Sequence, residues 1–241
     1  YIPLSPLSFL ARTADIFGAR TAIIYGERHY SWTQTYDRCR ALASALSRHG
    51  LGLGDTVSII AANTPEMYEA HFGVPMAGCV LNTINTRLEA ETIAYILADS
   101  DSKLLFADTA FHDSVAAALE MLDHDVEVID ICDLTLGDLP ALGKREYEEF
   151  IASGNTDYQW QLPDDEWQAL TLSYTSGTSG RPKGVVYHHR GSYLMSFGTV
   201  AAWQLGQHPT YLYTVPMFHC NGWGHAWTMA LMAAKIVLTR A

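Results

Sequence analysis

The strongest constraint on the fold is a regular alternation of strand-like and helix-like runs between residues 56 and 131. Short apolar runs alternate there with longer amphipathic stretches. The strand-like runs are residues 56–62, 80–84, 103–107 and 126–131, and the helix-like stretches between them are residues 65–78, 88–99 and 113–122. Such alternation is typical of βαβ units, in which successive strands lie parallel. The sequence therefore predicts an α/β fold with a parallel sheet.

Outside this region the pattern is less regular. The predicted helices are residues 8–17, 31–49, 146–152, 191–203 and 225–232, the predicted strands are residues 169–174, 185–187, 211–215 and 236–239, and a β-hairpin is predicted over residues 21–31. Residues 132–165 are rich in Asp, Glu, Gly and Pro, and they interrupt the alternation. We interpret them as a surface connection, with a link between two sheets as one option.

Composition and charge exclude several classes of protein. Hydrophobic residues make up 49% of the 241 residues and charged residues 17%, which is typical of a globular chain. The net charge is −11, and the 15 Lys and Arg residues are scattered, so the chain lacks the clustered positive charge that nucleic-acid binding requires. No apolar stretch is long enough to span a membrane, and no signal peptide is visible. These features predict a cytoplasmic protein, with organelle targeting by a missing terminus as the alternative.

The four cysteines are Cys39, Cys79, Cys132 and Cys220. None forms a CxxC pair, and their spacing fits no zinc site. We interpret them as ordinary reduced or buried thiols.

The most informative segment is the Gly/Ser/Thr-rich loop that follows the predicted strand 169–174. Its glycines allow the backbone to approach an anion closely, its hydroxyls donate hydrogen bonds, and Lys183 adds a positive charge suited to phosphate. The glycines are Gly177, Gly180 and Gly184, and the hydroxyl residues are Thr175, Ser176, Thr178 and Ser179. The loop matches neither the Walker A pattern nor the dinucleotide pattern GxGxxG. It predicts a cradle for a triphosphate, with a flexible linker as the alternative.

A second motif covers residues 214–225, where a predicted strand ends and a helix begins. Strand ends are where open α/β sheets bind ligands. Apolar, small and hydrogen-bonding side chains follow one another there: Phe218, His219, Asn221, Gly222, Trp223 and Gly224. These residue types suit the mouth of an acyl pocket, although a single histidine in such a segment is more often structural. A plain core role for Trp223 is equally open. We interpret His188 and His189 as structural, with an anion site at the following helix start as the alternative.

The segment Tyr-Thr-Ser-Gly-Thr-Ser-Gly-Arg-Pro-Lys-Gly-Val at residues 174–185 resembles the AMP-binding signature of the adenylate-forming superfamily. This superfamily includes acyl-CoA synthetases, firefly-type luciferases and adenylation domains of peptide synthetases. Residues 216–219 resemble its next signature, and the version His-Cys-Asn-Gly-Trp-Gly is most similar to short- and medium-chain acyl-CoA ligases, such as acyl-activating enzymes and methylthiopropionate-activating ligases. The resemblance covers essentially the whole chain.

The resemblance implies a layered α/β N-terminal large domain, here truncated. Residues 1–165 would form a first α/β subdomain, residues 166–241 would begin the part that carries the phosphate loop, and the C-terminal lid domain would be absent. In the superfamily the loop grips the β- and γ-phosphates of ATP as pyrophosphate leaves.

The implied site residues fall into four groups. The catalytic residues would be Lys183 and His219; the ATP-binding residues Thr175, Ser176, Gly177, Thr178, Ser179, Gly180 and Lys183; the substrate-pocket residues His219, Asn221, Gly222 and Trp223; and the Mg²⁺ ligand Thr178.

The implied activity is the ATP-dependent activation of a short- or medium-chain carboxylic acid, followed by transfer of the acyl group to CoA. ATP, Mg²⁺ and CoA would be required, and a homodimer is one option. The isolated 241-residue chain is expected to have little or no ligase activity, because the superfamily's later motifs lie outside it. Alternatives are an adenylation domain that loads a carrier protein, an aryl-acid ligase, or a non-catalytic nucleotide-binding module.

Overall fold

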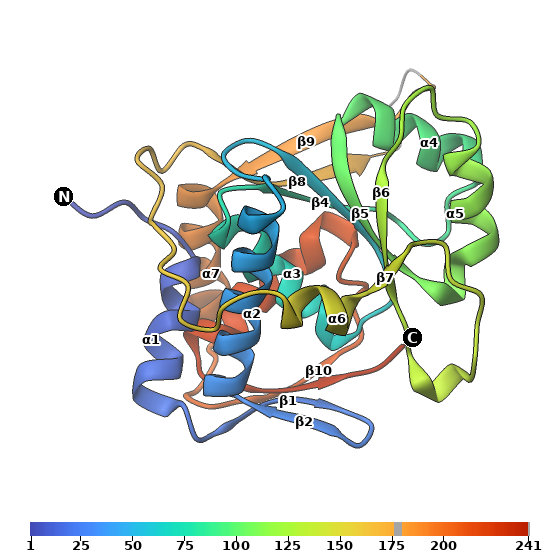
Figure 1. Cartoon of the computed structure of the whole chain (residues 1–241). Coiled ribbons are helices and arrows are strands. Elements are labelled where there is room, and N and C mark those ends of the chain that lie inside the picture. Colours follow the sequence, from blue (N-terminus) through green and yellow to red (C-terminus); the bar gives the residue numbers. More distant parts are fainter. Residues whose placement is uncertain (176–179, 241) are drawn as a thin grey trace.

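The computed structural model describes residues 1–175 and 180–240, and it confirms an α/β fold (Figure 1). The strands are β1 (Thr21–Tyr25), β2 (Arg28–Ser31), β3 (Thr56–Ile60), β4 (Val80–Thr83), β5 (Ser102–Asp108), β6 (Glu127–Ile131), β7 (Arg145–Glu146), β8 (Ala169–Thr175), β9 (Lys183–His188), β10 (Thr210–Tyr213) and β11 (Lys235–Leu238). The α-helices are α1 (Leu7–Phe17), α2 (Trp32–Arg48), α3 (Pro65–Met76), α4 (Ala90–Asp99), α5 (His112–Leu119), α6 (Tyr147–Ala152), α7 (His189–Trp203) and α8 (His225–Leu231).

Within the described residues, the strands form two sheets. The larger has seven strands in the order β7-β6-β5-β3-β4-β8-β9, and the smaller has four in the order β10-β11-β1-β2. All pairs in the larger sheet are parallel except β8 with β9, which form an antiparallel hairpin. The predicted parallel βαβ units over residues 56–131 are therefore confirmed, and the sheet departs from them only at the β9 edge.

The central strands of the larger sheet are buried on both faces. In β5, Leu104 and Phe106 belong to one core cluster, whereas Leu105 and Ala107 belong to another. Successive side chains of a strand point to opposite faces, so an apolar run without polar alternation is what a doubly covered strand requires.

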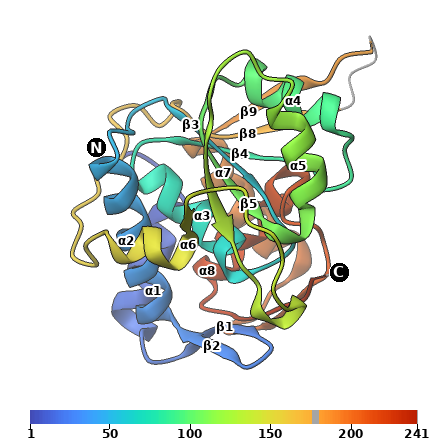
Figure 2. The same ribbon diagram turned by 45° about the vertical axis from the view of Figure 1, so that its right-hand side comes forward.

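Helices cover the two faces of the larger sheet (Figure 2). The helices α4 and α5 lie side by side on one face, where Ile93, Leu97 and Val115 form part of the smaller core cluster. The helices α2, α3 and α6 lie on the other face, between the two sheets (Figure 1). The larger core cluster is therefore enclosed by helices and by both sheets.

Local sequence signals set the starts of the helices between the sheets. At α2 the Ser31 side chain accepts a hydrogen bond from the Gln34 N–H, and the Gln34 side chain accepts one from the Ser31 N–H. This capping box satisfies two backbone donors that a helix start leaves unpaired. At α3 the Thr64 side chain caps the helix, and Pro65 occupies its first turn, where no N–H is needed.

The smaller sheet joins segments from the two ends of the chain. Strand β11 lies between β10 and β1 and runs parallel to both, so Ile23 stands beside Ile236. Strand pairing thus crosses the expected boundary at residues 165/166 in both sheets, since β8 also pairs with β4. That boundary stays a prediction.

Ion pairs link the smaller sheet to the larger one. Arg240 follows β11, and its guanidinium lies 3.0 Å from the Asp108 carboxylate at the end of β5 and 2.8 Å from that of Asp133. Burial of Asp108 raises the pKa of its carboxyl, and Arg240 acts in the opposite direction. Removing one partner would leave an uncompensated buried charge.

One expectation for residues 132–165 is wrong. These residues form β7 and α6, and they then run back to β8 in the same sheet, so they do not connect the two sheets. The short β7 pairs with β6, which keeps this surface connection on the larger sheet. No helix among the residues that the structure describes is long and apolar enough to cross a bilayer.

Candidate active site

A cavity lies at the carboxyl ends of strands β4 and β8 of the larger sheet. This loop-side cavity has a volume of about 410 Å³, and it is lined by Thr83, Asn85, Leu88, Thr92, Ile96, Tyr174, Thr175, Gly180, Pro182, Phe218 and His219. Open α/β sheets bind ligands outside the carboxyl ends of their strands. The two motifs singled out in the sequence meet here, because Thr175 comes from the first and His219 from the second.

The hairpin of β8 and β9 carries the Gly/Ser/Thr-rich loop. Thr175 pairs with Lys183 across the hairpin, so a hydroxyl residue and a cation stand at its end, and both are exposed. Gly180 has φ +95°, a conformation that favours glycine. The predicted ligands Ser176, Gly177, Thr178 and Ser179 lie outside the described residues. The structure therefore brings together Thr175, Gly180 and Lys183 of the predicted set.

The second motif forms an unusual backbone segment. His219–Gly224 is a short helical segment, and five of its residues have left-handed φ and ψ values: Cys220, Asn221, Gly222, Trp223 and Gly224. A left-handed conformation costs about 1–2 kcal/mol for each non-glycine residue, so this strain must be offset by contacts. We call residues 219–224 the left-handed segment.

Asn221 provides the main buried contacts of this segment. Its Oδ1 accepts a hydrogen bond from the Thr171 hydroxyl at 2.7 Å, and its Nδ2 donates to the Thr83 hydroxyl oxygen at 3.0 Å. Thr83 in turn donates to the Phe218 carbonyl at 2.8 Å. These threonines belong to β8 and β4, so the two strands hold the segment from below. Asn221 is buried, and both polar atoms of its amide group are hydrogen-bonded. We therefore assign it a structural role in holding the left-handed segment.

Gly222 and Tyr213 form the next support. The Tyr213 hydroxyl donates to the Gly222 carbonyl at 2.9 Å. A Cβ at position 222 would lie 2.3 Å from the Tyr213 hydroxyl oxygen, and φ at this residue is +61°. Gly222 is therefore required both for its conformation and for this close approach.

Asn63, in the loop between β3 and α3, was missed by sequence reasoning. Its Nδ2 donates to the carbonyls of Tyr213 and Val215, at 3.1 and 3.0 Å, and its Oδ1 accepts from the Met217 N–H at 2.7 Å. One buried amide thus fixes the chain that leads into the left-handed segment. Its only sequence signal is a polar residue directly after a buried strand.

A second cavity lies against the left-handed segment, and we call it the apolar cavity. Its volume is about 320 Å³, and it is lined by Tyr187, Gly191, Ser192, Met195, Cys220, Asn221, Trp223, Gly224 and Trp227. Of the predicted pocket residues, Asn221 and Trp223 line this cavity, His219 lines the loop-side cavity, and Gly222 lines neither. The α7 residues Gly191, Ser192 and Met195 were not predicted. The left-handed segment therefore contributes to the walls of both cavities.

His71 lies beneath the apolar cavity in α3. Its Nδ1 hydrogen-bonds to the Met67 carbonyl at 2.7 Å, and its ring packs edge-on against Trp227 at a centroid distance of 5.8 Å. Burial lowers the pKa of His71 to about 4, while the hydrogen bond to the Met67 carbonyl acts in the opposite direction. His71 is therefore neutral near pH 7.

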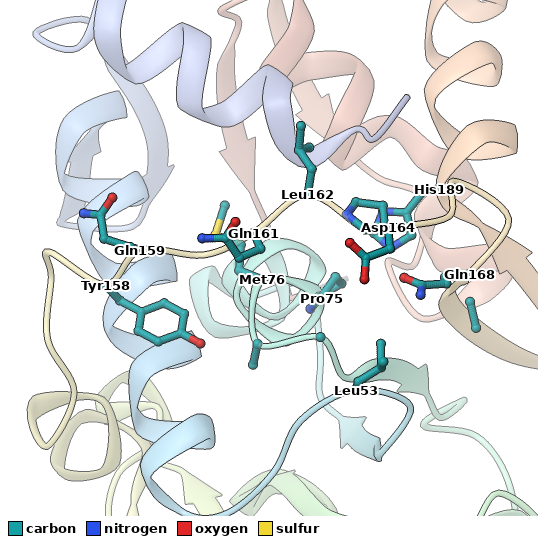
Figure 3. Close-up of a pocket in the computed structure, with 14 residues that line it drawn as sticks. Leu53, Pro75, Met76, Tyr158, Gln159, Gln161, Leu162, Asp164, Gln168 and His189 are labelled. Carbon is teal, nitrogen blue, oxygen red and sulfur yellow. The ribbon is translucent and has the colours of Figure 1, made fainter. Parts of the chain in front are cut away.

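A third cavity, of about 340 Å³, lies at the beginning of β8, the opposite end of this strand from the Gly/Ser/Thr-rich loop. Figure 3 shows Gln168, Asp164 and His189 around Pro75 and Met76 at the end of α3. This cavity contains none of the predicted site residues.

His188 and His189 have the structural roles expected of them. The Nδ1 of His188 accepts from the Gly191 N–H at 3.0 Å and caps α7, and the Nδ1 of His189 bonds to the Ser5 hydroxyl at 2.9 Å. The alternative of an anion site beside the phosphate loop is wrong. Because β9 runs antiparallel to β8, the start of α7 lies near Gln168, at the far end of β8 from the loop.

Among the described residues, no carboxylate that would hold Mg²⁺ lines the loop-side cavity. Mg²⁺ is usually held by one or two carboxylates together with substrate phosphates. No group of three or more His, Cys, Asp or Glu residues in the described part of the chain could hold a metal ion, and the residues lining the loop-side cavity include no carboxylate. The predicted ligand Thr178 lies outside the described residues. The four cysteines are free thiols, as expected.

The site thus combines a hairpin at the strand ends of an α/β sheet, with Thr175 and Lys183 at its tip, and an apolar cavity against the left-handed segment. A family model described as AMP-binding enzyme matches residues 10–241, so the chain belongs to the AMP-binding enzyme family. The resemblance found in the sequence is confirmed.

The relatives include CoA ligases. An acetate–CoA ligase of Humulus lupulus is 45% identical over 252 residues, which cover 100% of this chain and 44% of that protein. A peroxisomal trans-cinnamate:CoA ligase of Petunia hybrida is 42% identical over 255 residues, which cover 100% of this chain and 45% of that protein. The chain thus spans less than half the length of these two relatives.

A solved structure has the same fold. The anthranilate CoA ligase in complex with anthranoyl-AMP superposes with a TM-score of 0.87 at 20% identity, covering 100% of this chain and 45% of that one. At this identity the likeness concerns the fold alone.

Proposed function

We propose that the protein containing this chain activates a carboxylic acid with ATP to an acyl-adenylate and then transfers the acyl group to CoA. The observation that carries this proposal is the left-handed segment, which borders both the loop-side cavity beside the phosphate hairpin and the apolar cavity of about 320 Å³. Membership of the AMP-binding enzyme family supports the same reading, as do relatives named as CoA ligases.

In the first step, a carboxylate oxygen of the acid attacks the α-phosphorus of ATP, and the bond to the β-phosphate oxygen breaks. The products are the acyl-adenylate and pyrophosphate. A carboxylate is already a nucleophile, so this step requires no general base. It requires alignment of the two reactants and neutralisation of the charge on the leaving group.

The hairpin residues would supply that neutralisation. Lys183 provides a positive charge, Thr175 a hydroxyl, and Gly180 room for the backbone to approach phosphate oxygens. We assign Ser176, Gly177, Thr178 and Ser179 to the same role from the sequence. His219 lines the same cavity, and we propose that its side chain lies between the acyl group and the adenylate.

In the second step, the sulfur of CoA attacks the acyl carbon. A thioester forms, AMP leaves with the electrons of the acyl–oxygen bond, and the thiol proton is released. The acyl group would occupy the apolar cavity, whose volume lies at the lower end of the usual range for small-molecule sites. This volume supports a short or medium acyl chain, with Trp223 as the residue that limits its length.

The test is acid-dependent ATP–pyrophosphate exchange by the full-length protein. The panel should contain acetate, butyrate, hexanoate, palmitate, trans-cinnamate and anthranilate, followed by CoA or a carrier protein as acceptor. We expect the greatest exchange with acetate to hexanoate, and thioester formation with CoA. Loading of a carrier protein but not of CoA would identify a carrier-loading adenylation domain, and preference for the aromatic acids would identify an aryl-acid ligase. Absence of exchange with every acid, in a protein that still binds ATP, would identify a non-catalytic module.

Three further expectations remain proposals. Mg²⁺, with Thr178 as its proposed ligand, would add positive charge that helps Lys183 neutralise the phosphates of ATP, and chelation with EDTA during the exchange assay tests this requirement. A homodimer would be detected by sedimentation. The cytoplasmic location is tested by fractionation, and the peroxisomal trans-cinnamate:CoA ligase makes peroxisomes the compartment to compare.

A further inference from the structure

Both residues that flank the Gly/Ser/Thr-rich loop are attached to the same helix. The Tyr174 hydroxyl, just before the loop, donates to the Asp99 Oδ2 at 2.6 Å. The guanidinium carbon of Arg181, directly after the Gly/Ser/Thr run 175–180 of the loop, lies 5.7 Å from the centre of the Tyr95 ring. The Tyr95 hydroxyl donates to the Asp99 Oδ1 at 3.3 Å. The two attachments are therefore joined through one carboxylate.

The position of Tyr95 and Asp99 on α4 explains how they can act together. They are four residues apart on a helix, so their side chains lie on one face, one above the other. Thr92 and Ile96 of the same helix line the loop-side cavity. The helix thus forms one wall of that cavity and also holds the ends of the hairpin.

Asp99 occupies an unfavourable place for a carboxylate. It is the last residue of α4, where the helix dipole disfavours negative charge. Two tyrosine hydroxyls compensate by donating to it. Burial and the hydrogen bond to Asp99 raise the pKa of Tyr174, so its hydroxyl remains a donor at neutral pH. The Asp99 carboxylate therefore has two hydrogen-bond donors, Tyr174 just before the loop and Tyr95 on α4.

We propose that Tyr95 and Asp99 are positioning residues that hold both ends of the phosphate loop, as a clamp on the tip of the β8–β9 hairpin. The clamp keeps Thr175 opposite Lys183 in the arrangement that meets the phosphates of ATP. This inference rests on the proposed function. Because the clamp lies beside the loop-side cavity, it affects the binding of ATP and leaves the binding of the acid in the apolar cavity unchanged.

The experiment compares full-length wild type with Asp99→Ala and Tyr174→Phe. Glu91→Ala is the matched control, because Glu91 is an exposed acidic residue of the same helix with no hydrogen bond or ion pair in the described part of the chain. We expect Asp99→Ala to raise the KM for ATP about three- to tenfold, with kcat and the KM for the acid changed less than about twofold, as loss of one or two charge-assisted hydrogen bonds at the surface implies. Tyr174→Phe should give a smaller rise in the KM for ATP. In the double variant the KM for ATP should rise by less than the product of the two single-variant fold-changes, because both substitutions remove the same hydrogen bond. Glu91→Ala should match wild type.

Hydrogen exchange provides a second measurement that does not depend on catalysis. Amides at residues 174–175 and 183–184 should exchange faster in Asp99→Ala, and titration with ATP alone should give an apparent Kd about three- to tenfold weaker than in wild type. Unchanged amide exchange and Kd would overturn the clamp, as would an equal rise in the KM for ATP and for the acid. If wild type shows no acid-dependent exchange, the proposed function fails, and the Kd comparison still decides the clamp.

Discussion

The left-handed segment and the β8–β9 hairpin border the same cavity, but they are held in different ways. The segment is fixed by buried hydrogen bonds: it donates to Thr83 and accepts from Thr171 and Tyr213, and these bonds offset its strained backbone. The hairpin tip is exposed, and its attachments to α4 are surface contacts. The acyl side of the site is thus built into the core, whereas the phosphate side is set by charge and a few outer contacts. Substitutions on the acyl side should therefore lower stability, whereas substitutions on the phosphate side should lower activity with little effect on stability.

The largest effect should come from Lys183→Ala. Loss of the charge at the hairpin tip should lower the rate of ATP–pyrophosphate exchange about 10²–10³-fold, the range seen when a transition-state donor is removed. Lys183 is exposed, so the free energy of unfolding should change by no more than about 0.5 kcal/mol. Urea unfolding of the full-length protein provides the control. A large loss of stability in Lys183→Ala would contradict the statement that the phosphate side contributes to activity and the acyl side to stability.

Acid should weaken the acyl side. The pKa of His71 is lowered to about 4 in the folded state from 6.5, so the unfolded chain binds a proton that the folded chain excludes. The stability from this group is complete above pH 6.5, and it falls by up to about 3 kcal/mol as the pH drops toward 4. Unfolding free energies measured at pH 7 and pH 4.5 should differ less in His71→Gln than in wild type. Equal differences would show that His71 is not the source.

Two glycines allow the strain at the segment to be measured. Gly222→Ala should lower the free energy of unfolding by about 2 kcal/mol, because it combines a left-handed φ with a clash against Tyr213. Gly26→Ala is the matched control, since φ there is +56° and no atom lies within 4 Å of the added Cβ. It should cost about 1 kcal/mol for conformation alone. Adding Tyr213→Phe to Gly222→Ala should recover part of the difference, and failure to do so would remove the steric explanation.

The smallest effect should follow from Trp223→Ala. Trp223 is 58% exposed and lines the apolar cavity, so its truncation should lengthen the space for the acyl chain at little cost in stability. The ratio of kcat/KM for hexanoate over acetate should rise about tenfold, as expected for a few methylene groups in an apolar site. Trp203→Ala, at an exposed tryptophan of α7 outside the cavity lining, should leave the ratio unchanged.

The features that the sequence predicts are those with a local signal. The alternation over residues 56–131 predicts β3 to β6 and the helices between them, because periodicity is set by neighbours along the chain. The pairing of β1 with β11 has no such signal. In the site, Gly222 hints at a special backbone, whereas nothing local marks Cys220 or Trp223 as left-handed. Their conformation follows from long-range partners of Asn221.

The remaining contacts of the site are missed for the same reason. Asn63 lies in the loop between β3 and α3, and Asp99 is the last residue of α4. Polar residues are common at such positions in any α/β chain. Their roles depend on hydrogen bonds to segments that are distant in the sequence: residues 213–217 for Asn63, and Tyr174 for Asp99. The family resemblance supplied the roles of Lys183 and His219, which residue types alone left open.

The placement of β11 between β10 and β1 also bears on how the chain emerges from the ribosome. Ile23 is synthesised long before Ile236, so the β1–β2 hairpin remains without its inner neighbour until β11 has been synthesised. An isolated two-stranded hairpin is only marginally stable in water, and contacts between distant residues form slowly. The larger sheet, whose central strands are closer in sequence, should therefore be complete first. The nascent chain would then present an apolar strand edge to chaperones until β10 and β11 have been synthesised.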